Sequence, residues 1–305
     1  MFEHSQHILE MATGKPALRM AVVHPCDADS LHGALAAAQA GYIEPVLVGP
    51  IVKIRAAAER AGLDLAHYEL VDAPHSHAAA VEAVTLAAQH RVDALMKGSL
   101  HTDELMSAVV AQNSGLRTGR RISHVFIMDV PSYTRLLLIT DAAIHVQPTL
   151  DEKRDIVQNV IDLAQVLGIV EPKVAVLSAV ETITDKLQST IDAAALCKMA
   201  ERGQIRGGML DGPLAFDNAI SADAARSKGI HSPVAGQADV LIVPDLESGN
   251  MLAKQLQYLA GAHSAGVVVG ARVPIALTSR ADHVQARLLS CAITVLLATV
   301  TPHQQ

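Results

Sequence analysis

Short apolar runs alternate with Ala-rich stretches of helical periodicity along almost the whole chain. Short apolar runs bounded by turn residues predict strands, and apolar positions repeated every three to four residues predict amphipathic helices. Regular alternation of the two indicates βαβ units, hence an α/β fold with mostly parallel sheets and helices on both faces. The expected strands are Leu18–Val23, Pro45–Val48, His67–Val71, Val92–Met96, Ile122–Met128, Leu136–Ile139, Lys173–Leu177, Gly208–Leu210, Val240–Val243, Gly266–Val269 and Val273–Leu277.

The clearest helix start follows Pro148. Thr149 suits the N-cap position, and Glu152 three residues later completes a capping box. Asp151 adds favourable charge to the first turn, and Gly168 is a natural C-terminal stop. The sequence therefore predicts a helix between Thr149 and Gly168.

We place a domain boundary near Thr140–Gln147, just before this helix, and a second boundary near Gly270. The last strand and helix would then complete the sheet of the first domain. We expect residues 1–140 and 271–305 to form a first, discontinuous α/β domain, with residues 141–270 inserted as a second. A cleft between two domains is a natural substrate site.

Half of the 305 residues are hydrophobic, which supplies a substantial core and excludes a disordered chain. Aromatic residues make up only 2% and Trp is absent, so Ala, Val, Leu and Ile must build the core. Proteins that bind single strands stack bases on aromatic side chains, and proteins that bind duplexes present basic surface. A net charge of -7 with few aromatic residues therefore argues against nucleic-acid partners.

The cysteines and histidines show no metal-ligand spacing. Cys26, Cys197 and Cys291 lie far apart, so we expect buried reduced thiols and neither a disulfide framework nor a zinc site. The histidines are scattered without a paired-helix motif, and we expect no metal. The N-terminus lacks a signal-peptide pattern, and the apolar stretch Leu288–Val300 is too short to span a bilayer. We expect a cytoplasmic protein with no membrane partner.

The strongest candidate for chemistry is the turn Thr278-Ser279-Arg280-Ala281-Asp282, between an apolar run and a helical pattern. A strand, a short polar turn and a helix commonly present an anion site in α/β proteins. Arg280 in the first turn of a helix opposes the helix dipole, which makes better sense if an anion binds there. Ser279 as an N-cap with Asp282 as its capping partner is an equally good interpretation, and the two are compatible.

Two basic segments could bind phosphate. Lys97, the backbone of Gly98 and nearby hydroxyls follow one strand and precede a helix, the position of an anion cradle. The segment is not a Walker loop, and Thr102 serves equally well as a plain N-cap. The loop from Gly115 to Arg121 is a solvated turn or a phosphate clamp.

Two further turns, Asp211–Asn218 and Pro244–Asn250, place small and acidic residues after predicted strands. The alternative is that Asp217 and Ser248 are only helix caps. Ser123 enters the strand after the basic loop. The candidate residues for substrate binding are Lys97, Gly98, Ser99, Thr102, Arg117, Ser123, Asp211, Gly249 and Asn250.

Several stretches together resemble the phosphate acetyltransferase and phosphate butyryltransferase family. The matching pieces are MKGSLHTDELM, GLRTGRRISHVFIMDVP, ITDAAIHVQPT, DGPLAFDNAIS, SPVAGQADVLIVPDLESGNMLAKQL and VPIALTSRAD. They stand in family order from about Val92 to Leu296, and their combination is specific although no single piece is. GLRTGR and TSRAD look closer to the butyryl-type branch than to the acetyl branch.

The resemblance implies two α/β domains like those of isocitrate and isopropylmalate dehydrogenases, with the active site in the cleft, and usually a homodimer. It implies reversible acyl transfer between coenzyme A and orthophosphate, with coenzyme A as a substrate and no tightly bound cofactor. The family's Ser-Arg pair at the site matches Ser279 and Arg280. The acetyl branch has an Asp base six residues after that Arg, where this chain has Ala286. Asp282 is the nearby carboxylate, and the identity of the base stays open.

We expect direct transfer without an acyl-enzyme. A base removes the thiol proton of coenzyme A, because the thiolate is the nucleophile. Ser279 donates to the developing oxyanion, Arg280 holds the phosphate, and Asp282 is the base or orients Arg280. The alternatives are a metal- and NAD-dependent dehydrogenase of the same architecture, or a protein that binds coenzyme A or acyl-phosphate without catalysis.

Overall fold

The computed structural model describes residues 2–280 and 282–300. The chain divides into two compact units, which we call unit 1 (Met1–His4 and Ser123–Ser264) and unit 2 (Ser5–Ile122 and Ala265–Gln305). These limits differ from the predicted domain boundaries at 140 and 270, because the two strands after Ile122 belong to unit 1. The division into two domains stays a prediction.

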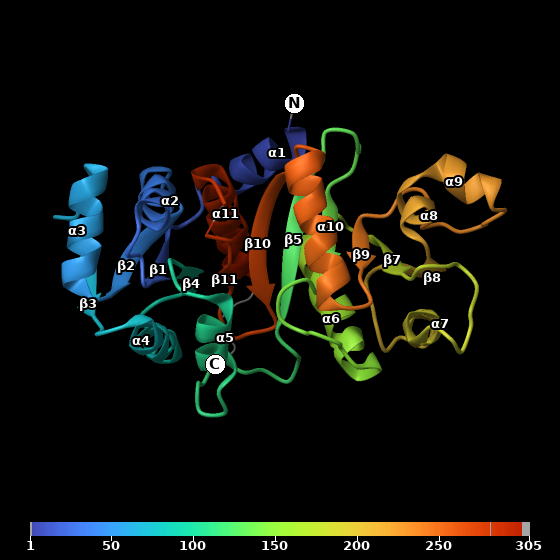
Figure 1. Cartoon of the computed structure of the whole chain (residues 1–305), viewed down its shortest axis with the longest axis horizontal. Helices are drawn as coiled ribbons and strands as arrows, with labels where there is room; N and C mark the ends of the chain where they lie inside the picture. Colours follow the sequence, from blue (N-terminus) through green and yellow to red (C-terminus); the bar gives the residue numbers. More distant parts are fainter. Residues whose placement is uncertain (1, 281, 301–305) are drawn as a thin grey trace. The chain divides into compact units, whose positions relative to one another are not determined.

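Unit 2 contains a mostly parallel sheet with the strand order β3-β2-β1-β4-β11-β10 (Figure 1). Strand β11 runs antiparallel to β10 and parallel to β4. Strands β1 and β4 are almost entirely buried, as expected for near-continuous apolar runs covered on both faces. The strands are β1 Leu18–Val23, β2 Ile43–Gly49, β3 Glu69–Asp72, β4 Ala94–Lys97, β10 His263–Val269 and β11 Ile275–Ala276.

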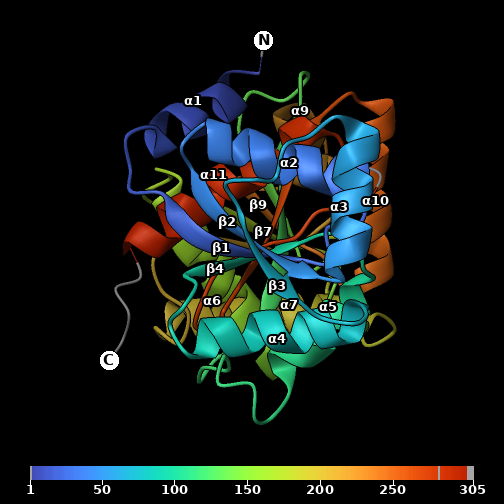
Figure 2. The ribbon, with the colours of Figure 1, turned by 90° about the vertical axis from the view of Figure 1, so that its left-hand side faces the viewer.

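Helices cover both faces of the unit 2 sheet. Figure 2 shows α2 and α4 on opposite sides of it. Helix α2 packs against α11, and α4 packs against α5. The Ala-rich faces of α2 and α4 are fully buried, since small side chains allow close packing on the strands. The helices are α1 Glu3–Ala12, α2 Ala28–Gln39, α3 Ile51–Ala61, α4 Ser76–Ala88, α5 Thr102–Val110 and α11 Val284–Val300.

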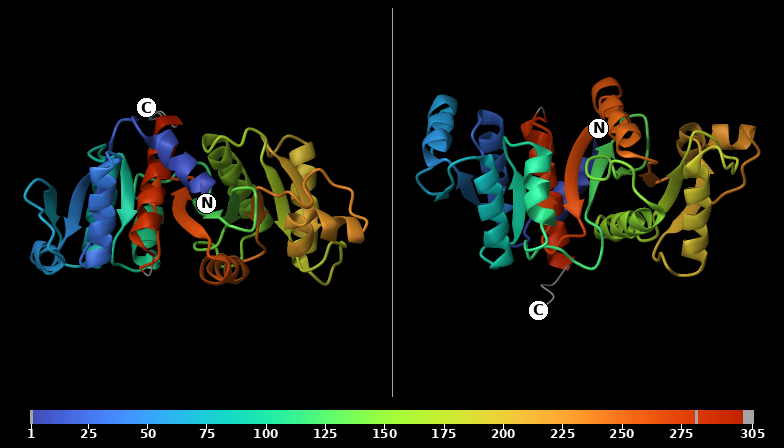
Figure 3. Two further views of the ribbon diagram at one scale, coloured as in Figure 1. Left: turned by 90° about the horizontal axis from the view of Figure 1, so that it is seen from above. Right: turned by 60° about the horizontal axis from the view of Figure 1, so that its bottom comes forward.

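Unit 1 contains strands in the order β5-β6-β9-β7-β8, and only the pair β5–β6 is antiparallel among its described strand pairs. Helices α6 and α10 lie on opposite sides of these strands (Figure 3). The strands are β5 Ser123–Asp129, β6 Leu137–Thr140, β7 Lys173–Leu177, β8 Met209–Leu214 and β9 Val240–Ile242. The helices are α6 Leu150–Val166, α7 Gln188–Glu201, α8 Phe216–Ile220, α9 Ala222–Ser227 and α10 Leu246–Leu259.

The hydrophobic pattern gave correct strand positions. Every predicted strand is present, and β1 and β7 have the predicted limits. The capping box at the start of α6 is also confirmed: the Thr149 hydroxyl accepts from the Glu152 amide at 3.4 Å, and the Glu152 carboxylate accepts from the Thr149 amide at 2.9 Å. The core is aliphatic as expected, for example around Leu137, Ile139 and Leu241 in unit 1.

The structure bears on the expectations about the cysteines and about membrane-spanning helices. The thiols are free, but only Cys291 is fully buried, while Cys26 and Cys197 are partly exposed. Burial raises the pKa of the Cys26 thiol to about 11 and that of Cys291 to about 12, so both stay protonated near neutrality. Among the described residues, no helix is long and apolar enough to cross a membrane.

Candidate active site

The turn after β11 is closed by Ser279 and Asp282. The Ser279 amide donates to Asp282 Oδ2 at 2.7 Å, and the Asp282 amide donates to the Ser279 carbonyl at 3.2 Å. Asp282 is only 5% exposed, whereas Ser279 is partly exposed and Arg280 is exposed. The interpretation of Ser279 as an N-cap is wrong, because α11 begins only at Val284. The Asp282 carboxylate instead fixes the backbone of Ser279.

Arg280 is joined to the start of α5. Its Nη2 donates to Nδ1 of His101 at 3.2 Å. His101, not Thr102, is the N-cap of α5, and its amide donates to Glu104 Oε2 at 2.8 Å. The prediction of Thr102 as the N-cap was one position too late, because an imidazole is an uncommon cap and the sequence offered a hydroxyl beside it. Thr102 is the first residue of α5.

Lys97 lies directly beneath the turn at the end of β4. Its ammonium group donates to the Thr278 carbonyl at 3.2 Å and lies 3.5 Å from the Gly98 carbonyl. The residue is 3% exposed. Burial lowers the pKa of Lys97 to about 8, and the neighbouring Arg287 and Arg280 act in the same direction. The structure thus brings together the predicted segments around Lys97 and Ser279, which are far apart in the sequence.

The neighbours of Lys97 hold the loop after β1. A Cβ atom added at Gly98 would lie 2.4 Å from the Val23 carbonyl, so only glycine fits this close approach. The Ser99 hydroxyl donates to the His24 carbonyl at 2.7 Å and accepts from the Cys26 amide at 3.1 Å. Ser99 therefore has internal partners for its hydroxyl.

Arg117 lies in a loop of unit 2 that is tied to the segment before β11. It forms an isolated β-bridge with Ala271, and the Thr118 hydroxyl donates to the Gly270 carbonyl at 2.6 Å. The Arg117 side chain is exposed. The backbone is thus fixed while the guanidinium is accessible to an anion.

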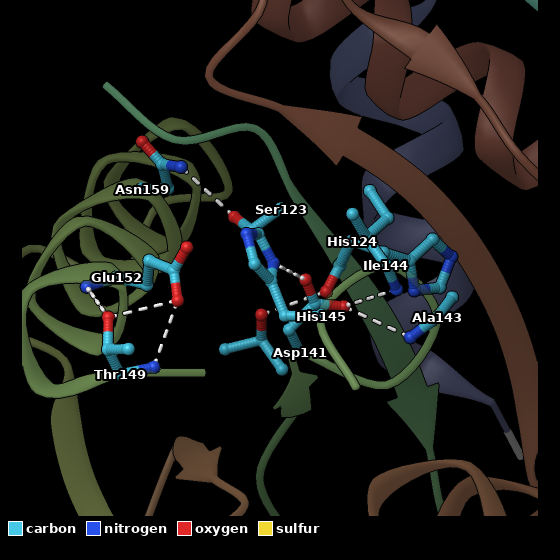
Figure 4. A network of polar contacts seen from close by, with 10 residues as sticks. Ser123, His124, Asp141, Ala143, Ile144, His145, Thr149, Glu152 and Asn159 are labelled. Atoms are coloured by element: carbon cyan, nitrogen blue, oxygen red, sulfur yellow. Dashed lines mark hydrogen bonds and ion pairs between the residues drawn. The ribbon is translucent and has the colours of Figure 1, made fainter. Parts of the chain in front are cut away.

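In unit 1, Ser123 is fully buried and accepts a hydrogen bond from Asn159 Nδ2 at 3.0 Å (Figure 4). This contact joins the start of β5 to α6. The hydroxyl thus has an internal partner, and a role of Ser123 in substrate binding stays a prediction.

The sequence reasoning missed a carboxylate–imidazole pair in the loop after β6. Asp141 Oδ1 accepts the amides of Ala143 and Ile144 at 3.0 and 3.1 Å, and Oδ2 lies 2.7 Å from His145 Nδ1 (Figure 4). The Asp141 side chain is fully buried and that of His145 is 15% exposed. An Nδ1–H donated to Asp141 leaves Nε2 of His145 as an acceptor, the arrangement of a general base. The four-residue spacing after a predicted strand was the available signal.

Helix α10 supports this loop. The side-chain Nδ2 of Asn250 donates to the Ala142 carbonyl at 3.2 Å, and a Cβ atom added at Gly249 would lie 2.9 Å from the Cβ atom of Ala142. Both predicted residues thus contact Ala142 and support the loop that contains Asp141. The interpretation of Ser248 as an N-cap is wrong: Asp245 is the cap, and its Oδ1 accepts the Ser248 amide at 2.8 Å.

Asp211 lies within β8, which is longer than predicted and ends at Leu214, so it is not in a loop after the strand. Its Oδ1 accepts the Gly212 amide at 2.8 Å. Asp217 lies inside α8 and pairs with Lys228 at 3.3 Å, so it is not an N-cap either. Within residues 2–280 and 282–300, no group of three or more His, Cys, Asp or Glu side chains could hold a metal ion.

The chain is similar over most of its length to one group of acyltransferases. A family model described as "Phosphate acetyl/butaryl transferase" matches residues 73–295. The phosphate acetyltransferase of Rhizobium meliloti is 64% identical over 277 residues, which cover 91% of this chain and 88% of that protein. The phosphate butyryltransferase of Clostridium acetobutylicum is 39% identical over 298 residues, which cover 98% and 99%.

Solved structures of similar proteins confirm the α/β fold class. A phosphotransacetylase from Streptococcus pyogenes superposes with a TM-score of 0.80 at 22% identity, covering 97% of this chain and 99% of that one. A branched-chain phosphotransacylase from Enterococcus faecalis V583 gives 0.78 at 27% identity, covering 91% and 99%.

The comparisons do not support the predicted closeness to the butyryl-type branch. Identity to the Rhizobium acetyltransferase is 64%, against 39% to the clostridial butyryltransferase. The prediction relied on the short pieces GLRTGR and TSRAD. Pieces this short describe the turn geometry of a site and carry less information about the branch than the identity across 277 aligned residues.

Proposed function

The chain belongs to the phosphate acetyl/butyryl transferase family, and we propose that within it the chain is a phosphate acetyltransferase. The reaction is the reversible transfer of an acyl group between coenzyme A and orthophosphate, with coenzyme A as a substrate. The observation that carries the site assignment is the turn in which Asp282 fixes Ser279 beside the exposed Arg280 and above the buried Lys97. The acetyl preference rests on the 64% identity to an acetyltransferase.

The geometry supports separate roles for Ser279 and Arg280. The Ser279 backbone is held by Asp282, and its partly exposed side chain supplies a hydroxyl to the carbonyl oxygen as negative charge develops there. Arg280 has a planar guanidinium suited to two oxygens of the phosphate, and it favours departure of that group. Lys97 adds positive charge beneath the same turn.

Thiolate formation needs a proton acceptor. Asp282 is a poor candidate, because a carboxylate that accepts a backbone amide is stabilised in its charged form. We propose that Asp282 positions Ser279, and that a group other than Asp282 is the base. That group takes the thiol proton, the thiolate attacks the acyl-phosphate carbonyl, and the phosphate leaves as its bond to the acyl group breaks.

The remaining predicted residues differ in the roles that we propose for them. Arg117 is an exposed cation that could hold a phosphate of coenzyme A. Gly98, Ser99 and Thr102 shape the segment that follows Lys97, and Gly249 and Asn250 support the loop after β6. Asp211 stays a candidate for substrate binding. A homodimer and a cytoplasmic location also stay predictions.

The test is a kinetic assay of the purified protein with acetyl-phosphate and coenzyme A. We expect acetyl-CoA formation that depends on both substrates, with Ser279→Ala and Arg280→Ala each lowering kcat/KM at least about tenfold, as for loss of one transition-state contact. Binding of coenzyme A without turnover of any acyl-phosphate would instead support a binding protein. Wild-type rates in both variants would refute the site assignment.

A further inference from the structure

Arg287 is a fully buried cation next to the proposed catalytic turn. It is the only charged residue in the sequence of α11 and is 1% exposed. Its Nη1 donates to the Thr278 hydroxyl at 3.1 Å, and its Nη2 donates to the Ser279 carbonyl at 3.2 Å. The buried guanidinium thus forms hydrogen bonds to two consecutive residues of the turn.

Among the described residues, Arg287 forms no ion pair with a carboxylate. Its Nε is buried without a hydrogen-bond partner. A buried charge without a partner is costly, and an arginine cannot relieve that cost by losing its proton. The contacts to Thr278 and Ser279 therefore replace an ion pair that most buried arginines have.

Lys97 reaches the same turn from β4. Both cations contact Thr278, Lys97 through its carbonyl and Arg287 through its hydroxyl. The two charges repel: Arg287 is, after burial, the largest cause that lowers the pKa of Lys97 to about 8, while Asp282 and Asp27 act in the opposite direction. Two buried cations thus contact the residue that precedes Ser279.

The packing makes room for Arg287 at one glycine. Gly33 lies on α2, which packs against α11. A Cβ atom at Gly33 would lie only 2.3 Å from Cδ of Arg287. Alanine is favoured over glycine inside a helix by about 1 kcal/mol. The absence of a side chain at Gly33 is thus explained by the space that Arg287 needs.

We infer that Arg287 is a positioning residue for acyl transfer: it fixes the Thr278–Ser279 backbone and supplies a buried charge that the phosphate of the substrate compensates. The inference rests on the proposed function. It accounts for the missing ion pair, because in the proposed reaction the bound phosphate brings a further anion to the turn. It also explains Gly33, because a side chain at this position would occupy the space of the Arg287 side chain.

Stability and activity separate this role from a merely structural one. If Arg287 only stabilised the fold, Arg287→Met would lower the melting temperature together with the amount of active enzyme. If the charge serves the anion, replacing an unpaired buried guanidinium by an apolar side chain of similar length should leave the melting temperature unchanged or higher. At the same time kcat with acetyl-phosphate should fall at least about tenfold.

The experiment compares wild type with Arg287→Met, Arg287→Lys, Gly33→Ala and the control Thr294→Val. Thr294 is also buried in α11, and its hydroxyl donates to the Ser290 carbonyl at 2.7 Å. The measurements are kcat, the KM for acetyl-phosphate, and the melting temperature with and without inorganic phosphate. We expect lower kcat in Arg287→Met and Gly33→Ala, a smaller loss in Arg287→Lys, and wild-type kcat in the control.

Inorganic phosphate should raise the melting temperature of the wild type and of Thr294→Val, and raise it less in Arg287→Met. Wild-type kcat and an unchanged phosphate effect in Arg287→Met would overturn the inference. So would loss of kcat only in proportion to loss of folded protein. If Arg287→Met does not fold, the same measurements are made on Gly33→Ala, which displaces the Arg287 side chain. Wild-type kcat and an unchanged phosphate effect in Gly33→Ala would then overturn the inference. An inactive wild type would refute the proposed function, whereas the phosphate effect on melting would still test Arg287.

Discussion

The carboxylate of Asp282 accepts the amide of Ser279 at 2.7 Å, and this contact fixes the geometry of the turn. An asparagine at this position keeps an oxygen that can accept the same amide, whereas an alanine does not. We therefore expect Asp282→Asn to retain most of the wild-type kcat and Asp282→Ala to lose at least about tenfold. Steady-state kinetics with acetyl-phosphate and coenzyme A measure both. An inactive Asp282→Asn with normal melting would return Asp282 to the role of base.

Lys97 links stability to pH. Its pKa is about 8 in the folded protein against 10.5 for an exposed lysine. Between these values the unfolded chain keeps the proton that the folded protein has lost, so the unfolded state binds more protons. The contribution of Lys97 to the free energy of unfolding should thus rise with pH from about 8 to 10.5 and stay flat below 8.

Urea unfolding of the wild type and of Lys97→Met across this pH range measures the contribution of Lys97. The difference between the two free energies should change in favour of the wild type as pH rises through the window. Lys53, an exposed lysine of unit 2, provides the control variant Lys53→Met. A parallel pH dependence in the wild type and Lys97→Met would contradict a lowered pKa at Lys97.

At the scale of elements, α6 owes its start to the capping box of Thr149 and Glu152. Replacing an N-cap threonine by alanine typically costs about 1 kcal/mol. Thr149→Ala should lower the free energy of unfolding by about this amount and leave kcat unchanged, because neither residue belongs to the proposed site. Denaturant unfolding and the standard assay measure the two effects. A large loss of kcat with unchanged stability would show that this helix start has a role in catalysis.

Elements with local sequence signals were predicted well. Strands such as β1 and β7 are apolar runs buried on both faces, and their limits follow from hydrophobicity alone. The start of α6 follows from two side chains three residues apart. The start of α11 was placed too early, because Asp282 satisfies the Ser279 amide within a turn that precedes the helix. The same pair of residue types fits both arrangements, and the sequence does not distinguish them.

Features of the candidate site that depend on contacts between distant residues were out of reach of the sequence. Lys97 and Thr278 are separated by 181 positions and meet only when β4 pairs with β11. In the sequence Arg287 is one charged residue next to an apolar stretch, and its contacts to Thr278 and Ser279 depend on the fold. The residue types at the turn, including Asp282, were found from the sequence, whereas Arg287, which fixes Thr278 and Ser279 from α11, was not.

At the scale of the whole molecule, the open question is which acyl group the protein prefers. Family membership covers both acetyl and butyryl transfer, and the identity of 64% to an acetyltransferase favours the smaller group. Each additional methylene that a pocket must accommodate or reject changes the transition-state free energy by about 1–3 kcal/mol, or about 10–200-fold. We therefore expect kcat/KM for acetyl-CoA with phosphate to exceed that for butyryl-CoA at least about tenfold.

A series of straight-chain acyl-CoAs assayed with phosphate under one condition measures this preference. A fall in kcat/KM at each added methylene would indicate a closed pocket, whereas equal values for acetyl and butyryl groups would indicate an open one. Preference for butyryl-CoA would mean that the short GLRTGR and TSRAD pieces reported the substrate better than overall identity does. In the proposed mechanism Ser279 and Arg280 bind the carbonyl oxygen and the phosphate, which all members of the series share. Ser279→Ala and Arg280→Ala should therefore lower kcat/KM by the same factor for every acyl group, while changes in the pocket alter the order of preference.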